Sequence, residues 1–437
     1  MIIPLQAQRT YKYRIHLTDK ATTNYTLDRP EEYLSDKALQ RRAKQYLKVD
    51  STDLPVCRTY INAIKSCGVE IVITGKWNNT VIVQCKDTAK IDQIALLPFV
   101  ETTQKVWISP DSLMVYTEDR KTKIENKLVK TDNLYGPAYR QIAIHHGDSL
   151  HRAGFRGEGM TIAVIDAGYY NADLMKVLKK MNLLGVRDFV NDQQDIYARS
   201  SHGMKVLSCM AANAERVMVG TAPQASYWLL RSEDEESEHL VEQDYWAAAI
   251  EFADSVGVDV VNTSLGYKTF DDKSKNYRYR DLDGKYSLMS RSAGMAADKG
   301  MVVVCSGGNE GNKTWKKITP PADAFNVLAV AAVDSSLVNA SFSSVGNTAD
   351  GRVKPDVSAI GKEATVLDID GNVSKANGTS FASPIFCGLV ACLWQARPEL
   401  TAKELMELIK KSGDRADFPD NIFGYGVPDM WKAFNTK

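Results

Sequence analysis

The feature that most constrains how this chain folds is a series of short, almost wholly apolar segments in the C-terminal part of the sequence. These segments are Thr161–Ile165, Ser226–Leu230, Val258–Val261, Met301–Cys305 and Val327–Val330. Apolar runs that do not alternate with polar residues are typical of parallel strands covered on both faces. Helical patterns such as Tyr245–Ser255 and Met289–Lys299 provide crossovers between them. The pattern predicts an α/β domain with a doubly wound parallel sheet.

A smaller domain is expected before this sheet. Strand patterns over Tyr11–Leu17, Val69–Thr74, Thr80–Gln84 and Val100–Val106 are interleaved with helical patterns at Leu34–Leu47, Cys57–Cys67 and Thr88–Leu96. Apart from one extra helix, this order is β-α-β-β-α-β, which predicts a small ferredoxin-like α+β domain over residues 9–117. Residues 118–134 are highly charged and are expected to be an exposed linker, the alternative being a solvated helix face. The sheet domain then occupies residues 135–437.

The composition excludes several classes of protein. The 437 residues carry 54 basic and 54 acidic side chains, whereas a nucleic-acid or anionic-membrane partner requires a concentrated basic surface. No apolar stretch approaches the roughly 18 residues that span a bilayer. The seven cysteines are scattered without a CxxC pair. They are therefore expected to be mostly small buried side chains, although Cys57 and Cys67 remain a permissible pair.

Four polar residues stand at the ends of apolar elements in the sheet domain: Asp166, His202, Asn309 and Ser380. Asp166 follows an apolar strand, and α/β sheets keep their sites at the carboxyl ends of strands. His202 begins a helical pattern, where the helix dipole disfavours the imidazolium form. Asn309 follows a strand in a glycine-rich turn and offers an amide donor for an oxyanion. Ser380 precedes a helix that is apolar almost all round, Ile385–Gln395, whose free N–H groups also favour an oxyanion.

Each of these residues alone has an ordinary structural explanation. The aspartate and the serine can be helix or turn caps, the histidine can be a surface residue, and asparagine beside glycine is common in turns. A dinucleotide fold is excluded because Gly157 and Gly159 precede the strand instead of following it. An α/β-hydrolase elbow is also excluded, because Ala382 stands where that motif needs its second glycine.

Taken together, the order Asp, His, Asn, Ser resembles the subtilisin family of serine proteases (subtilases, peptidase family S8). The motifs that carry this resemblance are Ile165-Asp166-Ala-Gly168, Ser201-His202-Gly203, Asn262-Thr-Ser264-Leu-Gly266, Gly308-Asn309-Glu-Gly311 and Gly378-Thr-Ser380-Phe-Ala-Ser-Pro384. The resemblance covers about residues 135–437. Tyr169 and Tyr170 replace the His or Pro often found after the aspartate, and Phe381 replaces a common methionine.

The resemblance implies a serine endopeptidase. Ser380 would be the nucleophile, His202 the general base and then acid, and Asp166 the residue that orients His202. Asn309 and the Ser380 N–H would form the oxyanion hole. Further residues would bind the substrate: Ser264, Leu265 and Gly266 by strand addition, and Ser306 and Gly307 around the side chain before the scissile bond.

The resemblance also concerns the N-terminal domain, which is similar to subtilase propeptides of the inhibitor type. Such a domain assists folding and blocks the cleft until it is cut. Apolar side chains between Trp107 and Glu118 (Ile108, Leu113, Met114, Val115 and Tyr116) would fill subsites, and self-cleavage is expected between Trp107 and Asn133. The partners implied are polypeptide substrates and this domain, with no nucleic acid and no transmembrane segment.

Cofactor and localisation follow from the same resemblance. No cofactor is required, but many subtilases bind structural calcium, and Asp281 and Asp283 resemble the start of a calcium loop without its full spacing. Residues 1–8 resemble the end of a signal peptide without a basic n-region. These features favour export to the periplasm, the cell surface or the medium.

Two other functions compete with a protease. A catalytically silent binding protein on the subtilase fold is the first, although such proteins usually lack a triad member and this chain has all three. A serine esterase of another fold is the second, and the Asp-His-Ser order weighs against it. A fluorophosphonate probe that labels Ser380, together with peptide hydrolysis, would separate these functions.

Overall fold

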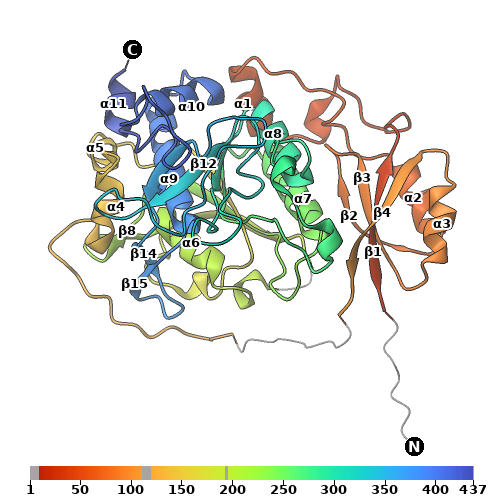
Figure 1. Ribbon diagram of the computed structural model, residues 1–437, viewed down its shortest axis with the longest axis horizontal. Helices are drawn as coiled ribbons and strands as arrows, with labels where there is room; N and C mark the ends of the chain where they lie inside the picture. The colour runs from red at the N-terminus through yellow and green to blue at the C-terminus, as the bar shows by residue number, and fades with distance from the viewer. Residues whose placement is uncertain (1–8, 111–119, 192–194, 437) are drawn as a thin grey trace, which may run out of the picture.

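A computed structural model describes residues 9–110, 120–191 and 195–436 and contains two domains that lie side by side (Figure 1). The larger domain is built on a seven-stranded sheet with the order β13-β12-β11-β10-β5-β9-β6, and every pair of neighbouring strands is parallel. Its strands are β5 (Thr161–Asp166), β6 (Asn182–Asp188), β9 (Ser226–Arg231), β10 (Val260–Thr263), β11 (Val302–Ser306), β12 (Leu328–Val333) and β13 (Val357–Ile360). The predicted α/β class with a parallel sheet is confirmed.

Alternating residues of the central strands face two different apolar cores. Ile162 and Val164 of β5 join the core that contains α6 (His202–Ala211) and α9 (Thr379–Ala396). Ala163 and Ile165 join the core that contains α7 (Val241–Ser255) and α8 (Leu288–Asp298). Because both faces are covered by helices, the strands are apolar at almost every position.

The remaining elements surround these layers. The helices are α4 (Tyr139–Ala143), α5 (Gly147–Arg152), α10 (Ala402–Lys411) and α11 (Met430–Asn435). There are also two short antiparallel strand pairs. One pairs β7 (Asn213–Ala214) with β8 (Met218–Val219), and the other pairs β14 (Ala364–Leu367) with β15 (Val373–Ala376). Among the described residues, α9 is the one helix long and apolar enough to cross a membrane. However, 89% of it is buried inside the protein, which makes it the central helix of the larger domain.

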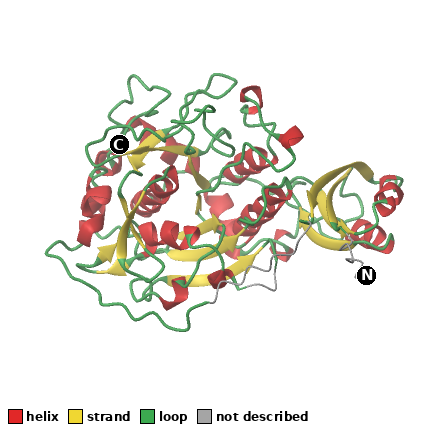
Figure 2. Ribbon diagram, turned by 60° about the horizontal axis from the view of Figure 1, so that its bottom comes forward, coloured by secondary structure: helices red, strands yellow, loops and turns green. Residues whose placement is uncertain are grey.

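The smaller domain has the predicted ferredoxin-like order. Its antiparallel sheet runs β2-β3-β1-β4, and α2 and α3 cover the face turned away from the larger domain (Figures 1 and 2). The elements are β1 (Tyr11–Leu17), α1 (Asp36–Lys44), α2 (Arg58–Ser66), β2 (Glu70–Gly75), β3 (Thr80–Cys85), α3 (Ala89–Ala95) and β4 (Val100–Ile108). All seven patterns expected in this region are therefore present.

The extra helix of this domain, α1, binds the larger domain. Lys37 Nζ lies 2.9 Å from Asp259 Oδ2, and Gln45 Nε2 donates to the Gly300 carbonyl oxygen at 2.8 Å. Arg41 and Arg42 both pair with the buried carboxylate of Asp254. These contacts explain why the sequence contains one helix more than the ferredoxin-like pattern requires.

A second part of the domain interface lies where the small sheet meets α7. Arg14 binds both carboxylate oxygens of Asp244 at 2.6 Å in a buried ion pair. The Glu251 carboxylate accepts from the backbone N–H groups of Lys76 and Trp77 at 2.7 and 3.0 Å. The buried charges at this interface are thus matched by partners.

The segment between the domains is less exposed than predicted. Residues 120–130 contain no helix or strand, as expected of a linker, but Ile124 is buried in the core of the larger domain. Arg120 pairs with Asp173 and Asp195, and Lys121 pairs with Asp370. The side chains of this charged stretch therefore fix it to the surface of the larger domain.

The seven cysteines are all free thiols. Six of them are buried and Cys67 is partly buried, which agrees with the expectation that most act as small apolar side chains. The permissible pair of Cys57 and Cys67 is not formed.

Candidate active site

The carboxyl edge of the parallel sheet brings the predicted site residues to one end of the larger domain. Asp166 is the last residue of β5, and His202 is the first residue of α6. Asn309 follows β11 in the glycine-rich turn, and Ser380 lies in the first turn of α9. A single cleft of about 650 Å³ is lined by His202, Asn309 and Ser380 together.

Asp166 and His202 form the central contact of the site. Asp166 is fully buried, and its Oδ1 lies 2.7 Å from His202 Nδ1 and 2.8 Å from the Ala167 nitrogen. Gly203 permits this approach, because a Cβ there would lie 2.8 Å from the Asp166 Cβ. Since the carboxylate only accepts, Nδ1 carries the proton, and Nε2 of a neutral ring is left as an acceptor.

Neighbouring carboxylates control the charge of His202. Burial lowers the pKa of the imidazole, but Asp166 raises it by its charge and its hydrogen bond, and Glu233 and Glu235 raise it further, to about 9. The carboxylates therefore act against the helix dipole, which was expected to disfavour the imidazolium. A helix terminus acts as only about half a charge, and the full charges of the carboxylates outweigh it.

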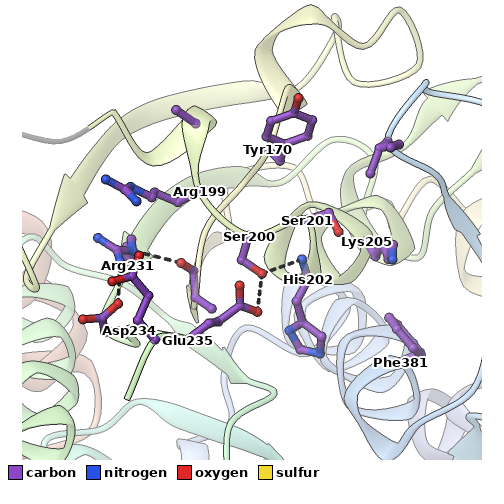
Figure 3. Close-up of a pocket in the computed structure, with 14 residues that line it drawn as sticks. Tyr170, Arg199, Ser200, Ser201, His202, Lys205, Arg231, Asp234, Glu235 and Phe381 are labelled. Carbon is purple, nitrogen blue, oxygen red and sulfur yellow. Dashed lines mark hydrogen bonds and ion pairs between the residues drawn. The ribbon is translucent and has the colours of Figure 1, made fainter. Parts of the chain in front are cut away.

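Figure 3 shows the surroundings of His202 on the side of Glu235 and Phe381. Ser200 Oγ donates to Glu235 Oε1 at 2.7 Å and accepts from the His202 backbone N–H at 3.1 Å (Figure 3). The ring of Phe381 lies 6.0 Å from the imidazole, centroid to centroid. Ser200 therefore connects the start of α6 to the acidic loop that follows β9.

Ser380 is held against the segment that follows β10. Its Oγ donates to the Ser264 carbonyl oxygen at 3.3 Å, and Ser264 Oγ donates to the Ser380 carbonyl oxygen at 2.8 Å. In the described structure no hydrogen bond joins Ser380 Oγ to His202. The reciprocal Ser264 contact was not predicted, because it depends on how two segments far apart in the sequence meet.

The amide of Asn309 is oriented by Thr379, which the sequence analysis did not single out. Asn309 Oδ1 accepts from the Thr379 backbone N–H at 2.9 Å and from Thr379 Oγ1 at 3.0 Å. The threonine hydroxyl in turn accepts from the Gly308 N–H at 3.1 Å. Because both bonds to Thr379 use the oxygen end of the amide, the Nδ2 donors of Asn309 are left for a ligand.

Most of the predicted substrate-binding residues line the cleft. Ser264, Leu265, Gly266 and Ser306 do so, but Gly307 does not, and its place is taken by Gly308. The Gly307 N–H donates to the Val330 carbonyl oxygen at 2.9 Å. This bond continues the pairing of β11 with β12 and directs Gly307 to the sheet.

Three acidic residues that the sequence analysis did not select also line this cleft: Glu233, Glu235 and Glu238. They belong to the loop between β9 and α7, where the sequence reads Glu-Asp-Glu-Glu-Ser-Glu over residues 233–238. This acidic run was the signal in the sequence that could have indicated these residues. The sequence alone does not show which way such a loop points, so the same acidic run also fits an ordinary solvated turn.

The weak calcium candidates do not converge on a common point. Asp281 Oδ2 accepts from the Arg278 N–H, and Asp283 Oδ1 accepts from the N–H groups of Lys285 and Tyr286, all at 2.7 to 2.8 Å. Both carboxylates therefore cap backbone turns. Within the part of the chain that the structure describes, the grouping with metal-ligand spacing is a different one, Glu233, Glu238 and Glu242.

Comparison with known proteins identifies the family of this chain. The profile of the subtilase family, peptidase family S8, matches residues 157–426. Since this match spans more than half of the sequence, the chain belongs to the subtilase family. A second profile, the peptidase S8 propeptide domain of Bacteroidota, matches residues 12–127. The predicted membership of the subtilase family is confirmed.

Individual relatives are distant. Subtilisin NAT of Bacillus subtilis subsp. natto is 30% identical over 281 residues, covering 64% of this chain and 66% of its own length. The thermophilic serine proteinase of Bacillus sp. (strain AK1) is 32% identical over 282 residues, covering 63% and 61%. This chain thus spans a little under two thirds of these relatives.

Solved structures show the same fold at lower identity. The structure of the MycP3 protease from the type VII (ESX-3) secretion system aligns with a TM-score of 0.56 at 20% identity, covering 72% of this chain and 95% of that one. The MycP1 protease from the ESX-1 type VII secretion system aligns with a TM-score of 0.55 at 21% identity, covering 74% and 92%. The subtilisin-like fold of the larger domain is confirmed.

Proposed function

We propose that this protein is a serine endopeptidase in which Ser380 is the nucleophile, His202 the general base and Asp166 the residue that orients His202. The observation that carries this proposal is the 2.7 Å contact between Asp166 Oδ1 and His202 Nδ1 in a cleft that also contains Ser380 and Asn309. Because this contact uses Nδ1, it leaves Nε2 as the nitrogen that would accept the serine proton.

Catalysis would begin when Ser380 Oγ leaves the Ser264 carbonyl oxygen and donates to Nε2 of His202. As Oγ attacks the substrate carbonyl carbon, its proton moves to Nε2, and the buried Asp166 carboxylate stabilises the resulting imidazolium. The imidazolium then donates that proton to the leaving amine. Water repeats the sequence on the acyl-enzyme and releases the second product.

The charge that develops on the substrate oxygen needs fixed donors. Asn309 Nδ2 is one, since Thr379 already occupies the other end of the amide. The Ser380 N–H is the second, because it lies in the first turn of α9, where backbone N–H groups lack an acceptor within the helix. Leu265 and Gly266 would pair with the substrate backbone, with Ser306 beside the side chain before the scissile bond.

Hydrolysis of an unstructured polypeptide tests this function. We expect the wild-type protein to release new amino termini, and the Ser380→Ala variant, purified in the same way, to release none above background. An uncut polypeptide with the wild-type protein would favour the alternative, a catalytically silent binding protein.

The N-terminal domain, residues 9–117, is proposed as the intramolecular inhibitor of this cleft, and residues 118–134 as the linker. Trp107 at the end of β4 lies against His239 of the loop that follows β9, with ring centroids 6.3 Å apart. Beyond the gap, Arg120 pairs with Asp173 and Asp195. These contacts hold the described residues on both sides of positions 111–119 against the larger domain. Of the residues proposed to fill the subsites of the cleft, Ile108 is the last residue of β4, and Leu113, Met114, Val115 and Tyr116 lie outside the described residues.

Self-cleavage between Trp107 and Asn133 follows from this proposal. Intact-mass spectra of the wild-type protein and the Ser380→Ala variant test it, since we expect a cut only in the active protein. If both stay whole while the wild type hydrolyses peptides, the domain is a permanent accessory.

The proposal also concerns export of the protein and the binding of structural calcium. Membership of a family that includes secreted subtilisins supports export, while the signal-like residues 1–8 lie outside the described residues. Structural calcium at Asp281 and Asp283 receives no support from the capping bonds that these carboxylates make.

A further inference from the structure

One polar side chain interrupts an apolar row at the centre of the large sheet. Asn262 of β10 is fully buried, and its partners in register on the two neighbouring strands are Val164 and Val304. Both valines belong to the core that contains α9, as does Val260, two residues before Asn262 on the same face of the strand. Burying an amide costs free energy unless its hydrogen bonds are made. The partners of Asn262 therefore indicate why an amide stands where a valine would fit.

The amide of Asn262 joins α9 to the segment that follows β10. Its Oδ1 accepts from Ser383 Oγ of α9 at 2.8 Å, and its Nδ2 donates to Ser264 Oγ at 3.2 Å. The Ser264 hydroxyl donates to the Ser380 carbonyl oxygen at 2.8 Å. All three serines are buried. A continuous chain of hydrogen bonds thus runs from α9 through Asn262 to the backbone of Ser380.

The direction of the bonds at Ser264 follows from the chemistry of the amide. An amide nitrogen only donates, so the Ser264 oxygen accepts from Asn262 and its single hydrogen is left for the Ser380 carbonyl. Ser383 keeps the amide in this orientation, because its hydroxyl donates to the oxygen end. Asn262 therefore orients the Ser264 hydroxyl towards Ser380.

The carbonyl of Ser380 needs this donor because its own helix cannot provide one. In an α-helix the carbonyl of residue i accepts from the N–H of residue i+4. Four residues after Ser380 stands Pro384, which has no N–H. The Ser264 hydroxyl replaces the missing donor. It thereby holds the backbone of the proposed nucleophile, and rotation of the Ser380 side chain is what remains to bring Oγ to His202.

The placement of the nucleophile affects turnover more than substrate binding. Misplacing a reacting group by about 1 Å can cost about 10²-fold in rate. Pairing with the substrate backbone is instead proposed for Leu265 and Gly266, which follow the serine that Asn262 orients. Loss of the Asn262 amide should therefore lower kcat and leave KM nearly unchanged.

We propose that Asn262 is a positioning residue of the endopeptidase, which acts through Ser264 to hold the backbone of Ser380 in place for proton transfer to His202. The proposal rests on the proposed endopeptidase function. It adds to that function a buried residue outside the cleft and the route by which this residue acts on the nucleophile.

The kinetics of an Asn262→Val variant test the proposal, because valine suits the neighbouring row and removes both hydrogen bonds of the amide. We expect kcat for a peptide substrate to fall by about 10- to 10²-fold, while KM changes by less than about threefold. Thr263→Val is the matched control. It removes the buried bond that Thr263 Oγ1 accepts from Trp246 Nε1 at 3.0 Å, in the core on the opposite face of the sheet, and should keep the kcat of the wild type.

Two double variants test the route of the effect. If Asn262 acts through Ser264, Asn262→Val should cost little more in a Ser264→Ala background, where the hydroxyl is already absent. Pro384→Ala restores the N–H that the Ser380 carbonyl lacks. In that background Ser264→Ala should lower kcat several-fold less than it does in the wild type. Comparison within each background cancels the effect of the background itself.

The outcomes are distinct. Wild-type kcat in Asn262→Val, or an equal loss in Thr263→Val, would overturn the proposal and leave the endopeptidase function intact. If Asn262→Val does not fold, Ser383→Ala takes its place, since it removes the donor that orients the amide, and wild-type kcat in that variant would overturn the proposal. Equal losses from Ser264→Ala with and without Pro384 would overturn the route. If the wild type cuts no peptide and a fluorophosphonate does not label Ser380, the endopeptidase function fails and this inference fails with it.

Discussion

The interface between the two domains and the catalytic cleft differ in how their buried charged side chains are paired. At the interface each buried charge has a partner, as in the pairs Arg14–Asp244 and Arg42–Asp254. In the cleft, Asp166 pairs with His202, whereas Glu233 and Glu238 have no ion pair with a described residue, and the charges of His202 and Lys268 only partly offset the burial that raises their pKa values. Matched charges fix the two domains relative to each other, whereas burial raises the pKa of Glu233 to about 8 and that of Glu238 to about 7 and thereby favours their neutral forms.

The largest expected effects lie in the cleft. Ser380→Ala, His202→Ala and Asp166→Asn should each lower kcat by about 10⁴-fold or more, and their effects should not add, because the three groups act as a unit. Thermal unfolding of the variants, followed by circular dichroism, should stay close to that of the wild type. A His202→Ala variant with near-wild-type turnover would show that the assignment is wrong.

At the interface we expect a loss of stability. Asp244→Ala leaves Arg14 buried without its partner and should lower the free energy of unfolding by about 3–5 kcal/mol. The measurement is denaturant unfolding in a Ser380→Ala background, which keeps the chain whole. Asp132→Ala removes the exposed partner of Arg216 and should cost less than about 1 kcal/mol. If the two variants lose the same free energy of unfolding, the buried ion pair stabilises the protein no more than the exposed one, and the account is contradicted.

Removal of one oxyanion donor should have an intermediate effect. Asn309→Ala should lower kcat by about 10²–10³-fold, because the Ser380 N–H remains as a donor. Thr379→Val tests the orientation of the amide, since it keeps the backbone bond to Asn309 Oδ1 and removes the bond from the hydroxyl. The loss in kcat for Thr379→Val should be smaller than that for Asn309→Ala. A larger loss would indicate that Thr379 itself contacts the substrate oxygen.

The smallest effect concerns pH. His202 must be neutral to accept the serine proton, and its pKa is raised to about 9, so kcat/KM should rise with pH and reach its midpoint in the alkaline range. Glu235→Gln removes a charge that raises this pKa and should move the midpoint to lower pH, whereas Glu158→Gln, at an exposed position before β5, should not. A maximum near pH 4 would instead indicate a carboxylate mechanism.

The sequence was informative where burial is complete. The five central strands are apolar at most positions and were predicted, whereas the edge strand β6 is exposed along most of its length and was not. The four-residue strand β13 forms the other edge and was also not predicted. Tertiary contacts thus determine the elements at the edges of the sheet, and local sequence patterns do not reveal them.

The same limit applies to the site. Asp166, His202, Asn309 and Ser380 were predicted because each follows or begins an apolar element. Thr379 and Ser264 act through contacts between segments 70 and 116 residues apart, and no local pattern reports such contacts. The acidic run over residues 233–238 was visible in the sequence, but only the path of its loop shows that it lines the cleft.

The identity of the nucleophile is tested most directly by peptide mapping of the protein after reaction with a fluorophosphonate probe. We expect one adduct, on the peptide that contains Ser380, and no adduct in the Ser380→Ala and His202→Ala variants. Labelling of another serine, or peptide hydrolysis by the wild type without any adduct, would contradict the assignment of Ser380 as the nucleophile.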